Sequence, residues 1–161
     1  MASRFFPEKD MDTIKRFNKE LIGDIVAGKD GIIYQPVVIY KVSVYDTETN
    51  MYGESASGKV YSRGVQVSCL VAADEQTTQT DEFGPDLQQT GIFSFLRQSL
   101  VDISFVIDIG DIIDWNDGYW EINSINESQF IGGQTSNNHS VICNTFLVRM
   151  SNLNIERIRS I

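Results

Sequence analysis

Residues 110–125 read GDIIDWNDGYWEINSI, and this stretch is typical of a β-hairpin. Asp117-Gly118 is a strong signal for a two-residue turn, because glycine tolerates positive φ and aspartate tolerates the left-handed region. With that turn at the tip, the two tryptophans face each other and so do two isoleucines, all on one side of the hairpin. A three-residue loop would break up this apolar face, so the pattern favours the shorter turn. The predicted structural hairpin comprises Ile113, Trp115, Asp117, Gly118, Trp120 and Ile122.

The chain on either side of the hairpin predicts further strands. Segments rich in β-branched and aromatic residues alternate with polar or glycine-containing stretches, as in antiparallel β proteins. We therefore expect a mainly β fold, a small antiparallel β-barrel or sandwich, with its core within residues 32–149. The expected strands lie in residues 32–46, 60–71, 91–97 and 140–149, with a helical turn at 98–104.

An amphipathic helix is predicted near the N-terminus, over residues 8–27. Apolar side chains recur there at spacings of three and four, so they form one stripe, and charged side chains take the opposite face. Gly28 and Gly31 supply a stop signal. The stripe needs a surface to pack against, and a sheet is the nearest candidate. Its members are Met11, Ile14, Phe17, Leu21 and Ile25.

Three polar segments, 46–59, 72–90 and 126–139, are expected to be loops, with a tail at 150–161. Because no internal repeat appears, residues 1–161 are predicted to form a single domain. The second loop carries five acidic residues and no lysine or arginine. A polar loop of such length is usually either functional or disordered. The candidate residues for an inter-subunit or lumen contact are Asp74, Glu75, Asp81, Glu82, Phe83 and Asp86.

The composition is that of a soluble, acidic globular chain. Thirteen basic and 22 acidic residues give a net charge of −9, which is poorly suited to gripping phosphate backbones but compatible with a passage through which DNA slides. Cys69 and Cys143 lie in apolar runs and are predicted to be free buried thiols in a reducing compartment. There is no signal-peptide pattern and no apolar run of the ~20 residues that cross a bilayer, so we expect a protein made in a cytoplasm.

Tempting chemical motifs are incomplete. Residues 53–60 nearly match a phosphate-binding loop, but Val60 stands where a magnesium-binding Ser or Thr is required, and strand character follows. Residues 46–57 resemble a calcium loop but lack its sixth-position glycine and twelfth-position glutamate. His139 is the only histidine, which excludes a His-rich metal site. Acidic neighbours argue against the hairpin aromatics as a platform for nucleobases. No catalytic, cofactor-binding or metal-binding residue is predicted.

Several short motifs are shared with a known family. They are GDIIDW at 110–115, GYWEI at 118–122, NESQF at 126–130 followed by Gly132-Gly133, VIYK at 38–41, NMYGES at 50–55, EFG at 82–84 and SVICNT at 140–145. Over roughly residues 10–150 the chain resembles the neck proteins of contractile-tailed, T-even-type bacteriophages. Smaller head–tail connector proteins of tailed phages carry a similar hairpin in a compact β-barrel.

The resemblance implies a structural protein of the virion neck, a head–tail connector that completes the head and is assembled in the bacterial host cytoplasm. It implies a homo-oligomeric ring of about six copies between the portal or adaptor and the tail proteins. Such a ring would close the DNA-filled head, and genomic DNA would pass through its lumen without specific binding. That role needs no catalytic residue, cofactor or membrane. A tail-terminator or baseplate protein, a small β-barrel that binds a ligand or nucleic acid, and an enzyme stay open as alternatives.

Overall fold

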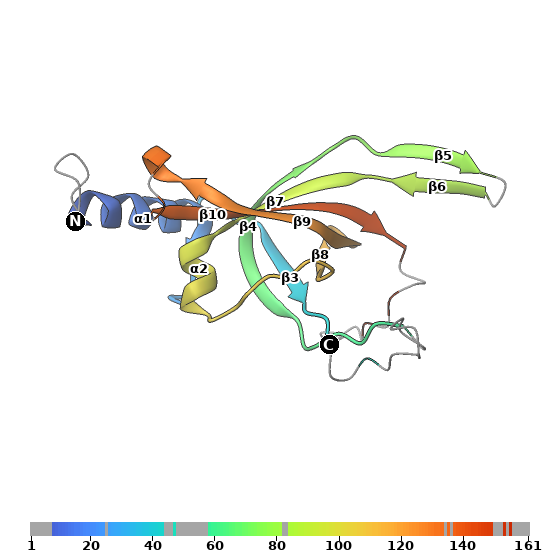
Figure 1. The fold of residues 1–161 in the computed structure, drawn as a ribbon, viewed down its shortest axis with the longest axis horizontal. Helices are drawn as coiled ribbons and strands as arrows, with labels where there is room; N and C mark the ends of the chain where they lie inside the picture. Colours follow the sequence, from blue (N-terminus) through green and yellow to red (C-terminus); the bar gives the residue numbers. More distant parts are fainter. Residues whose placement is uncertain are drawn as a thin grey trace.

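Six antiparallel strands close a β-barrel, which confirms the predicted mainly β fold (Figure 1). The computed structural model describes residues 8–24, 26–43, 47, 58–81, 84–133, 135, 137–149, 153 and 155. Around the barrel the order is β10-β7-β4-β3-β8-β9, and β9 pairs with β10 to complete the circuit. The six strands are β3 (Pro36–Tyr40), β4 (Val65–Ala73), β7 (Thr90–Leu96), β8 (Ile112–Trp115), β9 (Gly118–Phe130) and β10 (Asn138–Val148).

The remaining described elements lie outside the barrel wall. They are the helices α1 (Glu8–Ile22) and α2 (Arg97–Asp102), the short strands β1 (Gly23–Asp24), β2 (Lys29–Asp30), β5 (Thr77–Asp81) and β6 (Gly84–Gln88), and a 3-10 turn at Ile131–Gly133. The strand β7 and the turn α2 agree with the sequence prediction for residues 91–104. The single-domain organisation of residues 1–161 stays a prediction.

The barrel interior is a dense apolar core built by alternation along each strand. Side chains at every second position point inward, so each strand contributes one or two buried side chains to the core. Phe93 is central, since its ring meets those of Trp115 and Trp120 with centroids 5.8 Å apart in both cases. Cys69 and Cys143 are buried free thiols, as predicted. The fully enclosed set is completed by Val37, Ile39, Val67, Phe95, Ile113 and Ile122.

The hairpin between β8 and β9 forms on the predicted face but not in the predicted register. Trp115 pairs with Gly118, and Ile113 pairs with Trp120. The two tip residues are therefore Asn116 and Asp117, whereas the sequence analysis placed Asp117-Gly118 there. A shift of two residues leaves every side chain on its original face, so both tryptophans still point to the core.

The tip explains why this register wins. Asn116 and Asp117 have φ values of 52° and 59°, the left-handed conformation that the favoured two-residue hairpin turn requires at both positions. Gly118 is then free to stand opposite Trp115. A Cβ at Gly118 would lie only 3.0 Å from Leu147 Cδ1 and 3.4 Å from Trp120 Nε1, so the absence of a side chain at Gly118 makes room for these two side chains.

Helix α1 ends five residues earlier than predicted. Gly23 follows the helix with a φ of 105°, a conformation that a residue with a side chain rarely adopts. The chain then makes the small β1–β2 hairpin and returns against the helix, where the Ile33 amide donates to the Leu21 carbonyl at 2.8 Å. At Gly31 the approach is so close that a Cβ would lie 2.3 Å from the Ile22 carbonyl carbon. Ile25, the last predicted stripe residue, lies outside the described residues.

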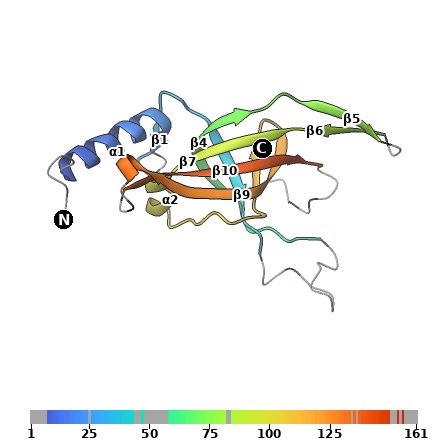
Figure 2. The same ribbon diagram turned by 45° about the horizontal axis from the view of Figure 1, so that its top comes forward.

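Two of the predicted loops are largely β-structure. Residues 72–90 contain β5 and β6, which pair with each other and prolong β4 and β7 beyond the barrel as a two-stranded arm (Figures 1 and 2). We call residues 74–90 the arm. Residues 126–139 include the end of β9, the 3-10 turn and the start of β10. Both sequences lack apolar alternation, but their strands continue pairings already fixed inside the barrel, and threonine favours strands in the arm. Most of segment 46–59 lies outside the described residues.

The molecule is elongated, and its two ends differ. Figures 1 and 2 show α1 at one end, beside α2, and the arm projecting from the other end. The barrel lies between them. Among the described residues, no helix combines the length and apolar character that crossing a membrane requires.

Candidate assembly surfaces at the two ends

The predicted structural hairpin is part of the barrel core. Trp120 is 3% exposed, and Ile113 and Ile122 are enclosed, whereas Trp115 is half-buried against them. The indole Nε1 of Trp120 donates to the Trp115 carbonyl at 3.4 Å. The aromatic side chains therefore hold the barrel together and do not form an exposed stacking platform. Asp117 is exposed at the tip of the hairpin and does not belong to this core.

Asp74 fixes the base of the arm. Its amide donates to the Thr90 carbonyl at 3.0 Å, and its carboxylate accepts a hydrogen bond from Thr90 Oγ1 at 2.5 Å. Its carbonyl accepts one from Gln89 Nε2 at 2.7 Å. Three residues, 74–76, stand opposite two, 89–90, because Ala73 pairs with Gly91 while Thr77 pairs with Gln88. Such an extra residue bends a strand, so the arm leaves the barrel at a bonded joint.

The described side chains of the arm beyond this joint form no core of their own. Glu75, Thr77, Thr78, Thr80 and Gln88 are all exposed. Backbone pairing from Thr77–Gln88 to Asp81–Gly84 holds the two strands together. Of the remaining candidate contact residues, Asp81 and Asp86 have their backbones in β5 and β6, while Glu82 and Phe83 lie outside the described residues.

At the opposite end, the apolar stripe of α1 is only half covered. Met11 and Ile22 are buried, but Phe17 is 56% exposed and Leu21 is 42% exposed. The segment that follows β2 continues this apolar surface, with Ile32 84% exposed. The sequence analysis required a surface against which the stripe packs. The barrel supplies part of that surface, and the rest of the stripe faces solvent.

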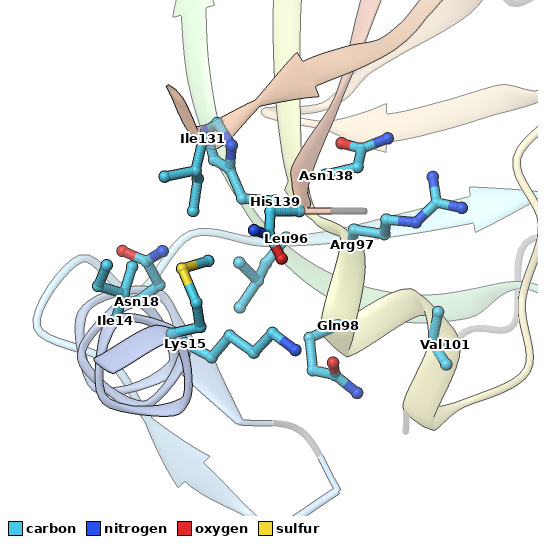
Figure 3. Close-up of a pocket in the computed structure, with 12 residues that line it drawn as sticks. Ile14, Lys15, Asn18, Leu96, Arg97, Gln98, Val101, Ile131, Asn138 and His139 are labelled. Atoms are coloured by element: carbon cyan, nitrogen blue, oxygen red, sulfur yellow. The ribbon is translucent and has the colours of Figure 1, made fainter. Parts of the chain in front are cut away.

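A pocket of about 180 Å³ lies between α1, α2 and the connection from β9 to β10 (Figure 3). Its apolar walls come from all three elements and from the end of β7, for example Met11, Leu96 and Ile131. Among the described residues that line it, Lys15 and Arg97 are charged and none is acidic. Figure 3 shows Lys15 extending from α1 toward α2 across the pocket.

His139 and its neighbours form the polar wall of this pocket. The Nδ1 atom of His139 is buried and has no hydrogen-bond partner among the described residues. Arg97 also makes an ion pair with Glu127 at 3.3 Å, which holds the guanidinium at the rim. Lys15 is exposed and takes part in none of the ion pairs found among the described residues.

One ion-pair network fixes α1 relative to α2. Lys19 Nζ lies 2.5 Å from Asp102 Oδ2 and 3.2 Å from Asp24 Oδ2. The hydrogen bonds from Lys19 and Gln98 hold the pKa of Asp102 below its ordinary value. In return, the hydrogen bond to Asp102, together with Asp24, raises the pKa of Lys19 against the effect of burial. These ion pairs hold α1 against α2, the two helices that line the pocket.

A second buried site, absent from the sequence analysis, lies beside the hairpin. Asp111 is 1% exposed, and its carboxylate accepts hydrogen bonds from the amides of Asp108 at 2.9 Å and Val42 at 3.1 Å. Burial raises the pKa of Asp111, and these hydrogen bonds partly oppose that rise. Lys41 closes the same corner by donating to the Val106 carbonyl and to Asp108. The Asp111 carboxylate thus joins the segment after β3 to the turn before β8.

The side chains that could take part in a reaction are buried or held in ion pairs. Burial raises the pKa of both Cys69 and Cys143 to about 12, so these thiols stay protonated at neutral pH. Lys59, from the segment that resembles a phosphate loop, pairs with Glu121 at 2.8 Å and precedes strand β4 rather than a helix. Among the described residues, no group of three or more His, Cys, Asp or Glu side chains is placed to hold a metal ion.

Sequence reasoning missed the pocket because its lining comes from three distant parts of the chain. Lys15 appeared only as a charge on the polar face of a helix, and His139 only as a surface residue in a polar loop. Neither position has a periodic or spacing signal that joins it to Arg97. The topology alone brings the three elements together, because β7 leads into α2 at the same barrel end at which β9 turns into β10.

Among the comparisons with known proteins, the search of solved structures gave matches. No protein-family model and no curated protein sequence matches the chain. Among solved structures, a chain of the structure titled "Virion of native gene transfer agent (GTA) particle" superposes with a TM-score of 0.47 and 12% sequence identity. The superposition covers 71% of the present chain and 94% of that chain. The function proposed below therefore rests on the geometry of the two ends and on the motifs in the sequence.

Proposed function

We propose that this chain is a structural protein of a phage-like virion, forming a neck ring of about six copies that joins the portal or adaptor to the tail and closes the DNA-filled head. The shared motifs around the hairpin suggest this role. The proposal includes no reaction, in keeping with the protonated thiols and the paired Lys59.

The observation that carries the proposal is the presence of two unlike surfaces at opposite ends of a rigid barrel. One end offers an extended polar arm, and the other offers a half-covered apolar helix beside a pocket. A contact between unlike surfaces of identical copies is heterologous, and it closes into a ring when the rotation between copies divides a full turn. A single self-complementary patch would instead give a closed dimer.

The charge of the chain suits a ring around DNA. A net charge of −9 repels the phosphate backbone, so DNA can move through a lumen of that sign without binding to its wall. A small β-barrel specialised for nucleic acid would need a basic face with accessible aromatic side chains. Trp120 is buried and Trp115 is half-buried here, and the residues beside them in the hairpin include Asp114, Asp117 and Glu121.

The test is the mass of the assembled protein. We expect light scattering and native mass measurement of the purified chain to show rings, or rings that form only after a portal ring is added. Electron microscopy of particles with the labelled chain should then place the label at the joint between head and tail. A label at the far end of the tail would identify a baseplate protein instead. A chain that stays monomeric with and without the portal would refute the proposal.

A further inference from the structure

We propose that the pocket beside α1 receives the acidic arm of a neighbouring copy. This inference rests on the ring proposed above and names the contact between its subunits. The arm is the only part of the described chain that projects beyond the barrel as an extended hairpin. The pocket lies at the other end of the long axis, so the two surfaces of one molecule are kept apart but can join two molecules head to tail.

Charge complementarity selects this occupant. Among the described residues that line the pocket, Lys15 and Arg97 are basic and none is acidic, and Lys15 is the cation without an ion pair, since Arg97 is paired with Glu127 at the rim. The arm has the opposite bias, with five acidic residues and no lysine or arginine. A positive surface that meets a negative one favours the correct pairing and rejects like-charged partners. Within this chain, the arm is therefore the segment best matched to the pocket.

The pocket and the arm also match in the kinds of side chain that they carry. The sequence at the end of the arm, residues 81–86, reads DEFGPD, which combines one aromatic residue with three carboxylates. The pocket combines apolar walls, such as Leu96 and Ile131, with a cationic rim. A volume of about 180 Å³ admits one or two side chains but not a pair of strands. Side chains from the arm therefore enter, while its backbone lies across the exposed flank of α1.

The chain's own ends fit the pocket less well. Residues 1–7 carry Arg4 and no acidic residue, and residues 150–161 carry two arginines and one glutamate, so both are net positive like the pocket rim.

Reversing one charge in the pocket tests the contact. Because Lys15 is exposed and outside the described ion pairs, Lys15→Glu should leave folding intact. We expect it to raise the concentration needed for ring assembly about tenfold or more, as loss of a close charge pair at an interface does. Lys9→Glu is the matched control, since Lys9 is exposed on the same helix but does not line the pocket. This control should assemble like the parent.

A mixing experiment tests the direction of the contact. One variant has residues 74–90 replaced by Asn-Gly, which joins the paired residues Ala73 and Gly91 with a two-residue turn. The other combines Lys15→Glu with Arg97→Gln. Each should be monomeric alone, because the first lacks an arm and the second lacks a functional pocket. Mixed together, one intact arm and one intact pocket remain, so we expect one-to-one dimers and nothing larger.

The outcomes separate this inference from the ring itself. Rings that form equally well from the parent, from Lys15→Glu and from the double pocket variant would overturn the arm-in-pocket contact and leave the neck ring standing. A parent that forms no ring under any condition would overturn the proposed function. Failure of the mixed variants to dimerise, when the parent forms rings, would also overturn the contact.

Discussion

The arm continues the pairing of the barrel strands β4 and β7, yet the arm and the barrel are held together by different forces. Inside the barrel, β4 and β7 pair Cys69 with Phe95 and Val71 with Phe93, and the side chains enter a closed core. Past the joint at Asp74, the same strand directions continue as β5 and β6, where the described side chains, such as Thr77, Thr78 and Gln88, are polar and exposed.

This difference teaches that the described side chains of the arm add little to the stability of their own subunit. A two-stranded hairpin alone is at best marginally stable in water. The described contacts that hold the arm are backbone pairing, the hydrogen bond that Thr77 Oγ1 donates to the Gln88 carbonyl, and the bonded joint at Asp74. In the proposed ring, contact with a neighbouring copy would add to these interactions. Four predictions test the contrast, in order of decreasing expected effect on the free energy of unfolding.

Trp120→Ala should have the largest effect, destabilising the barrel by about 3–5 kcal/mol, because it removes a buried aromatic side chain and leaves a cavity. The ring contacts with Phe93 and Trp115 would be lost at the same time. Urea unfolding followed by circular dichroism measures the loss. Trp115→Ala, at a half-buried position, should cost less. Equal losses at the two positions would contradict the burial gradient across the hairpin.

Asp111→Ala should destabilise the barrel by about 2 kcal/mol, because it leaves the amides of Val42 and Asp108 without their acceptor in a buried corner. Asp111→Asn keeps one oxygen acceptor and should lose less. Thermal unfolding of the parent and both variants gives the comparison. If alanine and asparagine behaved alike, the hydrogen bonds would not be what holds this corner.

Acid should weaken the contact between α1 and α2 by about 1 kcal/mol, the scale of a partly exposed ion pair. Hydrogen bonding from Lys19 lowers the pKa of Asp102, so its contribution is complete above the ordinary value of 3.8 and is lost as pH falls through the lowered value. The pKa of Lys19 is raised, so its contribution is complete below 10.5 and is lost above that.

This pH dependence is measured by comparing the parent with Asp102→Asn. The difference in unfolding free energy between the two should be constant through neutral pH and should shrink at the acid end. A difference that did not change with pH would show that the network stabilises the helix pair through packing rather than charge.

Substitutions in the arm should have the smallest effect on stability. Thr78→Ala removes an exposed side chain that touches no core, so we expect a change within about 0.5 kcal/mol. The same variant measured in ring assembly can show a larger change, because the arm acts between subunits. A destabilisation of the monomer comparable to that of Trp120→Ala would mean that the arm belongs to the barrel's own core.

The sequence could predict the barrel because burial imposes a period of two on short strands. Phe93 and Phe95 on one face, and the tryptophans with Ile113 on one face, follow from that alternation alone. The register of the hairpin did not follow, because Asn116-Asp117 and Asp117-Gly118 are both competent turns and give the same faces. The left-handed conformation of Asn116 and Asp117 and the close packing around Gly118 decide between the two registers.

The arm and the pocket were beyond such reasoning for two separate reasons. The arm has no apolar pattern, so its strands are invisible to periodicity, and its pairing follows only from its continuity with β4 and β7. The pocket depends on three segments that meet in space, so no local signal joins Lys15 to Arg97 and His139. The helix was predicted from its apolar stripe, but of the four stripe residues that the structure describes only Met11 is buried, because coverage of a stripe is a tertiary property.

Closure of the barrel limits where the protein can pair its strands with those of other chains. Each of its six strands has a neighbour on both sides over part of its length, so this part of the barrel wall offers no free edge to an incoming strand. Among the described strands, unpaired edges remain on the two small hairpins, β1–β2 and β5–β6, and on the second half of β9, which pairs with β8 only over Gly118–Glu121 and from Asn123 onward pairs with β10 alone. Backbone-mediated stacking, whether orderly or as aggregation, is thus directed to these segments rather than to the fully paired part of the barrel wall.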